Sequence, residues 1–198
     1  MRQLFGVALG AGLLWATSSV AIAADQYAID PAHSTAAFAV KHLAINTVHG
    51  RFAEVSGAIL YDEQDVTKSS VTVTIKAASI NTDNAKRDEH LRSADFFDAA
   101  QFPDITFRST RIQSTADGYL CVGTLTMHGV SKEVTIPFTI LGKIEDPWGK
   151  TRLGVEASLG LNRLEYGIVW NKTLGNGSLV VGTDVKITLN VEAVQQAQ

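Results

Sequence analysis

Ionisable side chains gather between residues 80 and 107, a stretch that interrupts a chain otherwise rich in alternating apolar and polar residues. Arg87, Asp88 and His90 lie within four positions of each other, beside further charged residues. Such a group could bind the polar part of a ligand or supply an acid–base group to a hydrolase. It could equally pair internally and fix the stretch to its neighbours, as ion pairs at junctions between elements commonly do. We favour the structural role and keep ligand contact as the alternative.

The spacing of the other reactive residues gives little support to metal or nucleophile chemistry. The five histidines show no H-x-H, H-x₃-H or HExxH spacing, and one cysteine cannot form a thiolate pair. We therefore predict no metal site, although residues from distant strands could still build one. The chain has no G-x-S-x-G motif and no assignable Ser-His-Asp set. Cys121 lies in a run typical of a β-strand, which indicates a partly buried structural thiol.

The ionisable stretch also predicts a helix. Thr82 or Asp83 can cap a helix that continues to Arg92, and Pro103 returns the chain to a strand. Aromatic and aliphatic side chains follow the charged residues, and a charged helix backed by such residues is expected to act as a plug or lid at the mouth of a barrel. These aromatic and aliphatic side chains are Leu91, Phe96, Phe97, Phe102 and Phe107.

Alternation with a period of two dominates the rest of the chain and predicts strands with one apolar face. Gly57 predicts a bulge, Pro137 predicts an edge or irregular pairing, and residues 46–50 predict a turn. The expected strands cover residues 27–30, 33–42, 52–61, 71–77, 105–112, 119–127, 134–141, 153–161 and 181–191.

The predicted fold class is therefore all-β, a closed antiparallel β-barrel of about eight strands. A sandwich would also fit the one-sided alternation, but the long strands and the single helix favour the barrel. The helical insertion, at about residues 83–100, is expected to close one end. A barrel of this size can hold its own side chains or one slender ligand.

An export signal is predicted at the start of the chain. Arg2 precedes an apolar run at residues 4–15, and Ala21-Ile22-Ala23 matches a cleavage site, so removal of residues 1–23 is expected. Residues 24–198 then form one domain of suitable length. Loss of Arg2 changes the formal net charge from −3 to −4. With no basic run, nucleic acid is not expected as a partner.

An ordered series of motifs closely resembles the YceI family. The series covers nearly all of residues 24–198 in the family's order, with small departures such as Glu165-Tyr166 where Asp-Phe is commoner. Each motif is modest, but the ordered series is highly specific. It comprises Tyr27-Ala-Ile-Asp30-Pro-Ala-His33-Ser34, His42-Leu43, Gly50-Arg-Phe52, Gly57, Ser79-Ile80-Asn-Thr82, Arg87-Asp88-Glu-His90-Leu91, Asp95-Phe96-Phe97, Phe102-Pro103-Asp-Ile105-Thr-Phe107, Gly123-Thr-Leu125-Thr126-Met-His128-Gly129-Val130 and Asn162-Arg163-Leu-Glu165-Tyr166-Gly167-Ile168.

The resemblance implies a lipocalin-like barrel located in the bacterial periplasm. Its long hydrophobic cavity would hold a polyisoprenoid chain, such as that of an isoprenoid quinone or prenyl phosphate, or a similar long-chain amphiphile, without a covalent cofactor. The implied role is transport or storage of that lipid, with a membrane as its donor or acceptor. The resemblance also implies that the protein is not an enzyme and that homodimers are common.

The inward faces of the predicted strands, together with the insertion, supply an apolar lining. Any single member of this set could instead belong to the ordinary core. The predicted pocket residues are Phe38, Val40, Phe52, Val73, Ile75, Phe96, Phe97, Phe107, Leu125, Phe138, Ile140, Leu159, Ile168 and Trp170. His42, Arg87 and His90 are the candidates for contact with a head group at the mouth, with His42 on the same strand face as Phe38 and Val40.

Two other functions stay open from the residues alone. A lipid-processing hydrolase that uses His42 or His90 predicts turnover of prenyl or acyl esters. A stress-response module without a ligand predicts an empty core. A carrier predicts that lipid is retained without turnover.

Overall fold

The computed structural model describes residues 24–197, so the predicted signal segment 1–23 lies outside the described residues. One antiparallel sheet contains all the strands of this part of the chain, and one α-helix, α1 (Ala85–Arg92), accompanies it. The strands are β1 (Asp25–Ile29), β2 (Thr35–His42), β3 (Asn46–Phe52), β4 (Val55–Tyr61), β5 (Ser70–Lys76), β6 (Ile80–Asn81), β7 (Asp104–Thr115), β8 (Gly118–Met127), β9 (Val130–Glu145), β10 (Thr151–Asn162) and β11 (Val181–Gln195).

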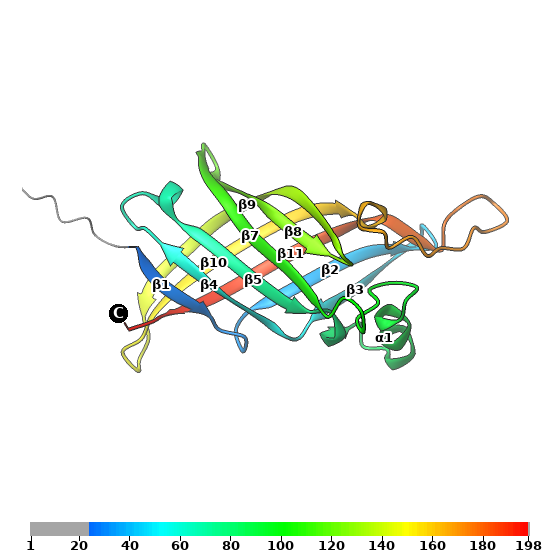
Figure 1. Ribbon diagram of the computed structural model, residues 1–198, viewed down its shortest axis with the longest axis horizontal. Helices are drawn as coiled ribbons and strands as arrows, with labels where there is room; N and C mark the ends of the chain where they lie inside the picture. The colour runs from blue at the N-terminus through cyan, green and yellow to red at the C-terminus, as the bar shows by residue number, and fades with distance from the viewer. Residues whose placement is uncertain (1–23, 198) are drawn as a thin grey trace, which may run out of the picture.

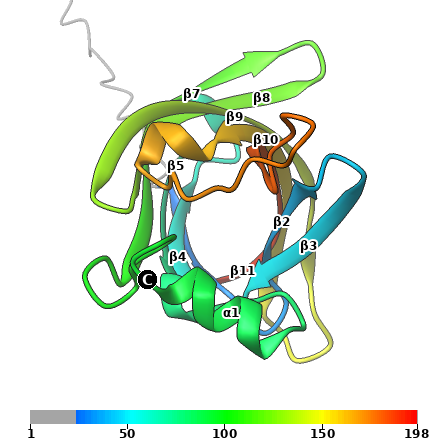
Figure 2. The ribbon, with the colours of Figure 1, turned by 90° about the vertical axis from the view of Figure 1, so that its right-hand side faces the viewer.

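The sheet closes into the predicted barrel. Eight strands follow one another in the order β1-β4-β5-β7-β8-β9-β10-β11, and β11 pairs back with β1 (Figures 1 and 2). Along the same side of β11, β2 continues the line of β1, and β3 and β6 extend the wall beyond it. α1 lies at this extended end of the barrel, across part of its rim (Figure 2).

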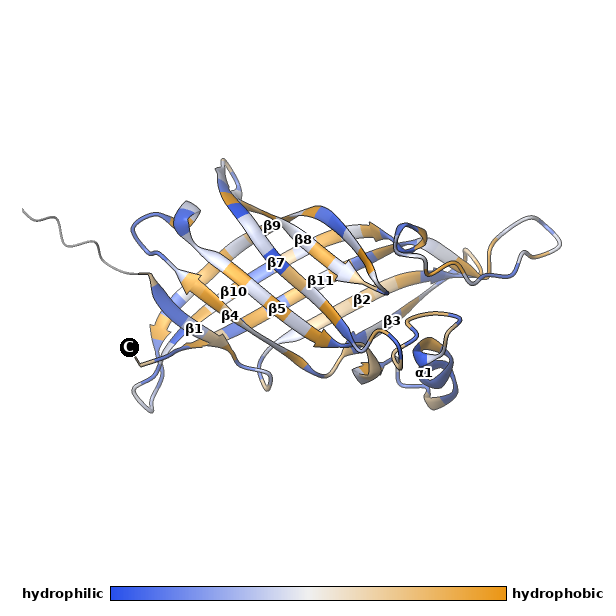
Figure 3. Cartoon of the chain, viewed as in Figure 1, coloured by the Kyte–Doolittle hydropathy of each residue, from blue (hydrophilic) through white to orange (hydrophobic). Residues whose placement is uncertain are grey.

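Alternation along the strands fixes which side chains face inward. β10 and β11 are in register over a long stretch, with Leu159 opposite Ile187 and Ala157 opposite Leu189. Directly opposed residues share a face of the sheet. Apolar residues therefore line the interior while residues such as Lys186 and Asn190 stay exposed. Figure 3 shows the resulting change between apolar and polar residues along the strands.

The turn predicted at residues 46–50 is wrong, because these residues form most of β3. Thr47 and Val48 favour extended backbone, and Val48 pairs with Val40 of β2. The turn lies earlier in the chain, at Leu43 and Ala44, whose φ angles are 55° and 61°. Leucine and alanine are not typical turn residues, so the sequence pattern placed the turn too far along the chain.

The two other irregularities predicted in the strands have opposite outcomes. The bulge at Gly57 is wrong, since β4 stays in register with β5 throughout. Gly57 is needed for close approach, because a Cβ atom there would lie 2.2 Å from the backbone oxygen of Thr72. The irregular pairing at Pro137 is confirmed: β9 pairs with β10 only as far as Phe138, which pairs with Ala157. Pro137 therefore has a strand neighbour on one side, at Leu120 of β8.

The predicted helical insertion is confirmed, but its cap is not the predicted one. Asn84 caps α1, its side-chain oxygen accepting a hydrogen bond of 3.0 Å from the backbone N–H of Arg87. Thr82 is occupied by other contacts, and Asp83 adopts a left-handed φ of 59°. Turns lead from Ser93 to β7. Within residues 24–197, no helix has the length and apolar character needed to cross a membrane.

Candidate functional site

Four cavities follow one another inside the barrel. The first is lined by Tyr61 and Ile140 among others, the second by Ile75 and Leu125, and the third by Phe97 and Ile168; the fourth lies at the α1 end. The space between their side chains, including space open to solvent, is about 760, 850, 650 and 690 Å³. The exposed lining of the first three is entirely apolar. The interior is therefore not filled by its own side chains.

Shared wall residues show that these cavities adjoin one another along the barrel, and we call the row that they form the path. Phe107 lines both the first and the second, Phe52 both the second and the third, and Phe38 both the third and the fourth. An apolar path of this kind suits an extended hydrocarbon chain better than a compact polar ligand.

Every residue predicted for the pocket lies on the wall of one of these cavities. Val73, Phe107, Phe138 and Ile140 line the first; Phe52, Val73, Ile75, Phe107, Leu125 and Leu159 the second; Phe38, Val40, Phe52, Phe96, Phe97 and Ile168 the third; and Trp170 the fourth. Contact with a ligand remains a prediction for each of them.

The sequence reasoning missed much of the wall contributed by β10 and β11. The signal was available, because these residues belong to the same alternating faces as the predicted ones. The residues missed include Leu153, Val155, Leu161, Ile187, Leu189 and Val191.

Aromatic rings close the α1 end of the path. The rings of Phe97 and Phe52 meet edge to face with centroids 5.6 Å apart, and those of Phe96 and Trp170 lie 5.2 Å apart. α1 itself is mostly exposed, and Asp88 is its one buried residue. The apolar part of the predicted lid is therefore the segment that follows the helix, which packs Phe96 and Phe97 against the barrel.

Arg87 and Asp88 both bind Thr82 rather than each other. Arg87 donates from Nε to Thr82 Oγ1 and from a terminal nitrogen to the Thr82 carbonyl, each at 2.7 Å. Asp88 accepts from the Thr82 N–H at 2.9 Å and from its hydroxyl at 2.5 Å. This arrangement fastens α1 to the end of β6. Arg87 nevertheless lines the fourth cavity.

His90 and His42 lie on the same cavity as Arg87. His90 Nε2 is 2.7 Å from Asp95 Oδ2, and its ring meets that of Trp170 edge to face at 4.9 Å. His42 ends β2 and pairs with Val181 of β11. Arg87 and His90 belong to α1 and His42 to β2, and all three line the fourth cavity. It is the cavity among the four whose exposed lining includes polar atoms.

A buried arginine that the sequence did not single out organises the neighbouring wall. Arg163 is 5% exposed and donates hydrogen bonds to the backbone carbonyls of Gly182, Ile168 and Trp170 at 2.9, 2.6 and 2.9 Å. Burial lowers the pKa of its guanidinium. These bonds fix the loop that carries Ile168 and Trp170 against the start of β11.

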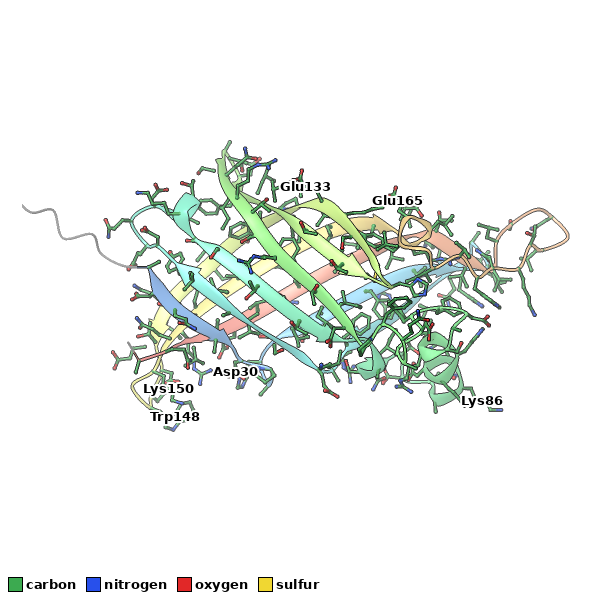
Figure 4. All side chains as sticks on the ribbon, viewed as in Figure 1. Asp30, Lys86, Glu133, Trp148, Lys150 and Glu165 are labelled. Atoms are coloured by element: carbon green, nitrogen blue, oxygen red, sulfur yellow. The ribbon has the colours of Figure 1, made fainter. Side chains whose placement is uncertain are left out.

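At the opposite end of the barrel, Asp30, His33 and Glu192 place one ligand atom each within 4.8 Å of the others. Figure 4 shows Asp30 far from Lys86 of α1. The spacing in the sequence could not reveal this group, because Glu192 comes from the last strand. Arg152 donates to both carboxylates, at 3.0 Å to Asp30, so a guanidinium already offsets part of their negative charge.

Cys121 is buried on the wall of the first cavity. Burial raises the pKa of its thiol to about 11, which keeps it protonated at neutral pH. No histidine lines that cavity within the described part of the chain. These surroundings support the structural interpretation of the thiol.

A family model of the YceI-like domain matches residues 27–193. A UPF0312 protein of Enterobacter sp. (strain 638) is 38% identical over 197 residues, which is 98% of each chain. The chain belongs to the YceI family. A UPF0312 protein of Pseudomonas aeruginosa (strain LESB58) is also 38% identical over the same length.

Solved structures share the YceI fold seen here. The Campylobacter jejuni YceI protein is 32% identical with a TM-score of 0.67, over 79% of this chain and 90% of that one. Burkholderia cenocepacia BcnA is 23% identical with a TM-score of 0.71, over 83% and 98%. A polyisoprenoid-binding domain from Saccharophagus degradans is 18% identical with a TM-score of 0.61, over 86% and 98%.

Proposed function

We propose that this YceI protein holds the chain of a polyisoprenoid, such as an isoprenoid quinone or prenyl phosphate, or a similar long-chain amphiphile, in its barrel. The observation that carries the proposal is the row of four adjoining cavities, because the exposed lining of the first three is entirely apolar. The ligand is bound without covalent attachment, and its transport or storage is the role.

Hydrocarbon burial supplies enough free energy for such binding. Each five-carbon isoprene unit contributes roughly 3 kcal/mol of gross transfer free energy, at about 0.8 kcal/mol per CH₂. Association and ordering of the ligand offset much of this gain. A few units inside the path still give useful affinity. Chain length rather than head group is therefore expected to dominate the free energy of binding.

The polar head is proposed to rest at the fourth cavity. Its wall combines Arg87, His90 and His42 with apolar residues, whereas the exposed lining of the other three cavities is apolar. A phosphate or a quinone carbonyl can accept hydrogen bonds from these side chains. The amphiphile then lies with its tail pointing away from α1.

Export of the chain is part of the same proposal. The segment 1–23 has the pattern of a cleaved signal, and the periplasm is the proposed location. A carrier there would keep a water-insoluble lipid in solution between membranes. A membrane is accordingly the proposed donor or acceptor.

Mass spectrometry of an organic extract of the purified protein tests the proposal. We expect a long-chain amphiphile in the extract, and recapture of a polyprenyl lipid by the emptied protein. A clean extract together with failure to capture any lipid on reloading would reject the carrier and leave the ligand-free module. Conversion of added prenyl or acyl esters, lost on His42→Ala or His90→Ala, would favour the hydrolase.

A further inference from the structure

The rim of the fourth cavity carries a patch of unusual composition, which we call the mouth lobe. It consists of the β2–β3 hairpin (residues 35–52) and residues 167–183, which lead into β11. The two parts are bonded together: the Leu43 N–H donates to the Val180 carbonyl at 2.9 Å, and the Val180 N–H to the Lys172 carbonyl at 2.9 Å. Figure 2 shows both parts at the rim of the barrel, across from α1.

The mouth lobe is basic in a protein of negative net charge. It contains Lys41, Arg51 and Lys172 and no aspartate or glutamate, although the whole chain has a formal charge of −3. Lys41 and Lys172 are exposed, and no ion pair is formed by any of the three within residues 24–197. The positive charge is therefore free to meet an anionic partner.

Acidic groups on neighbouring elements lie outside the mouth lobe. Residues 83–100 of the insertion carry three basic and five acidic side chains, and β11 adds Asp184 just beyond the lobe. Asp88 is bound to Thr82 and Asp95 to His90 within the insertion. The α1 end as a whole therefore has no net formal charge, and its positive charge is concentrated in the mouth lobe.

Large apolar side chains project from the same lobe. Ile45 is 85% exposed, Val169 65% and Leu179 38%. Ile45 follows Leu43 and Ala44, two residues held in the left-handed region, which normally selects asparagine or glycine. An apolar hairpin turn in this conformation is unfavourable for a surface that meets only water.

The opposite end of the barrel offers a useful contrast. Trp148, Ile144 and Leu141 are exposed there as well, at 79%, 65% and 66%. Their charged neighbours are of both signs, because Glu145 and Asp146 accompany Lys150, and Arg152 is bound by three carboxylates. Exposed apolar residues occur at both ends, but in the mouth lobe the charged side chains beside them are all basic.

From these observations we infer that the mouth lobe docks on the surface of an anionic phospholipid bilayer. Ile45 and Leu179 enter the interface while Lys41 and Lys172 attract the head groups. Lys41, His42 and Val180 also line the fourth cavity, so docking turns the mouth of the path toward the membrane. This inference rests on the proposed function, and it names the partner and the face used for lipid exchange.

Sedimentation with vesicles tests the inference, using residues 24–198 so that the apolar segment before them does not itself bind lipid. We expect binding to vesicles of phosphatidylglycerol and phosphatidylethanolamine, weak binding to phosphatidylcholine alone, and a loss of binding at high salt. Lys41→Gln and Lys172→Gln should each weaken binding about fivefold. Ile45→Ser combined with Leu179→Ser should weaken it about tenfold or more.

A matched variant at the far end, Trp148→Ser with Lys150→Gln, should leave vesicle binding unchanged. Equal losses at both ends, or no binding to anionic vesicles, would overturn the inference. So would a dimer that the Ile45→Ser and Leu179→Ser variant converts to a monomer in the absence of vesicle binding, since the lobe would then be a subunit interface.

Loading with a polyprenyl lipid from detergent, without vesicles, separates this inference from the proposed function. Lipid uptake from detergent with no vesicle binding rejects the docking surface alone. Vesicle binding by a protein that takes up no lipid rejects the proposed function and with it the exchange role of the lobe.

Discussion

At the scale of single residues, the charged groups of this protein mostly serve the backbone around them. Arg87 and Asp88 meet at Thr82, and Arg163 donates to backbone carbonyls of the loop that follows it and of the start of β11. The sequence favours internal pairing of these charged residues. In the structure Arg87 and Asp88 both bind Thr82 rather than each other. Arg87 differs from the other two because it also borders the fourth cavity.

Arg87→Ala should discriminate between ligands. If the guanidinium meets the head group, affinity for a prenyl phosphate should fall about tenfold or more while affinity for a neutral quinone changes little. Titration of both ligands by fluorescence quenching measures this. Arg92→Ala is the control, since Arg92 donates to the carbonyls of Ala78 and Ile80 on the same insertion. Equal losses for the two ligands would refute a head-group role.

Asp30 and His33 predict a pH dependence of stability. The hydrogen bond between them lowers the pKa of Asp30 to about 2 and raises the pKa of His33 above 6.5. The contribution of His33 to the free energy of unfolding is complete below pH 6.5, and it is lost as pH rises through the raised pKa. The Asp30 contribution is present above pH 3.8 and is lost as pH falls toward 2.

Thermal unfolding at pH 5.5 and pH 8.5 tests the direction of the His33 effect, because Asp30 stays ionised at both pH values. The midpoint should be higher at pH 5.5, by no more than about a few degrees because the pair is exposed. His33→Asn should remove the difference. A difference of the same size in the variant would show that other groups cause it.

At the scale of elements, the insertion between β6 and β7 divides into two parts. α1 is polar and is held by its cap and by Thr82, while the turns after it deliver Phe96 and Phe97 to the barrel. Phe96 is 6% exposed, and Phe97 is partly buried against Phe52. The segment after the helix is therefore the part that can act as a lid.

Phe97→Asp should weaken capture of a polyprenyl lipid more than it alters the fold. A carboxylate on the third cavity opposes the entrance of hydrocarbon, whereas partial burial lets the charge reach water. We expect about a tenfold loss of affinity with an unchanged far-ultraviolet circular dichroism spectrum. Phe102→Asp, which alters a ring packed on His128 rather than on a cavity, is the matched control. If Phe97→Asp simply unfolds the protein, Phe97 is core and the lid assignment is wrong.

At the scale of the whole molecule, closure of the sheet creates the apolar path. Strands from both halves of the chain meet around it, and β11 completes the ring by pairing with β1 and β10. The path extends from Tyr61 and Ile140 at one end to Trp170 at the other. Its length is therefore a property of the barrel and not of any one element.

Ala157→Trp should shorten the path. Ala157 lines the first cavity, so a bulky ring there would fill space that a long tail needs. We expect at least about a tenfold loss of affinity for long polyprenyl chains and little change for short ones, which need only the other cavities. Binding assays with a chain-length series measure this. Ser158→Trp places the same ring at the next, exposed position and should have no effect. Equal behaviour toward all lengths would argue against an extended tail.

The sequence by itself determined the barrel and most of its lining. Alternation of apolar and polar residues has a period of two that depends only on local backbone geometry, so Val73, Phe107 and Leu159 could be assigned to the interior without coordinates. The ordered motifs also identified the family without coordinates, because they are read directly from the residues. Pro137 revealed irregular pairing because a missing N–H is a local property.

Only the tertiary structure decided how distant residues combine. The turn at Leu43 and Ala44 is bonded to Val180, and Gly57 is required by the backbone of a neighbouring strand. The meeting of Asp30 with Glu192, and of His42 with Arg87 and His90 on one cavity, depends on closure of the sheet. Such contacts join residues far apart in the chain, and no local pattern specifies which strand edges pair.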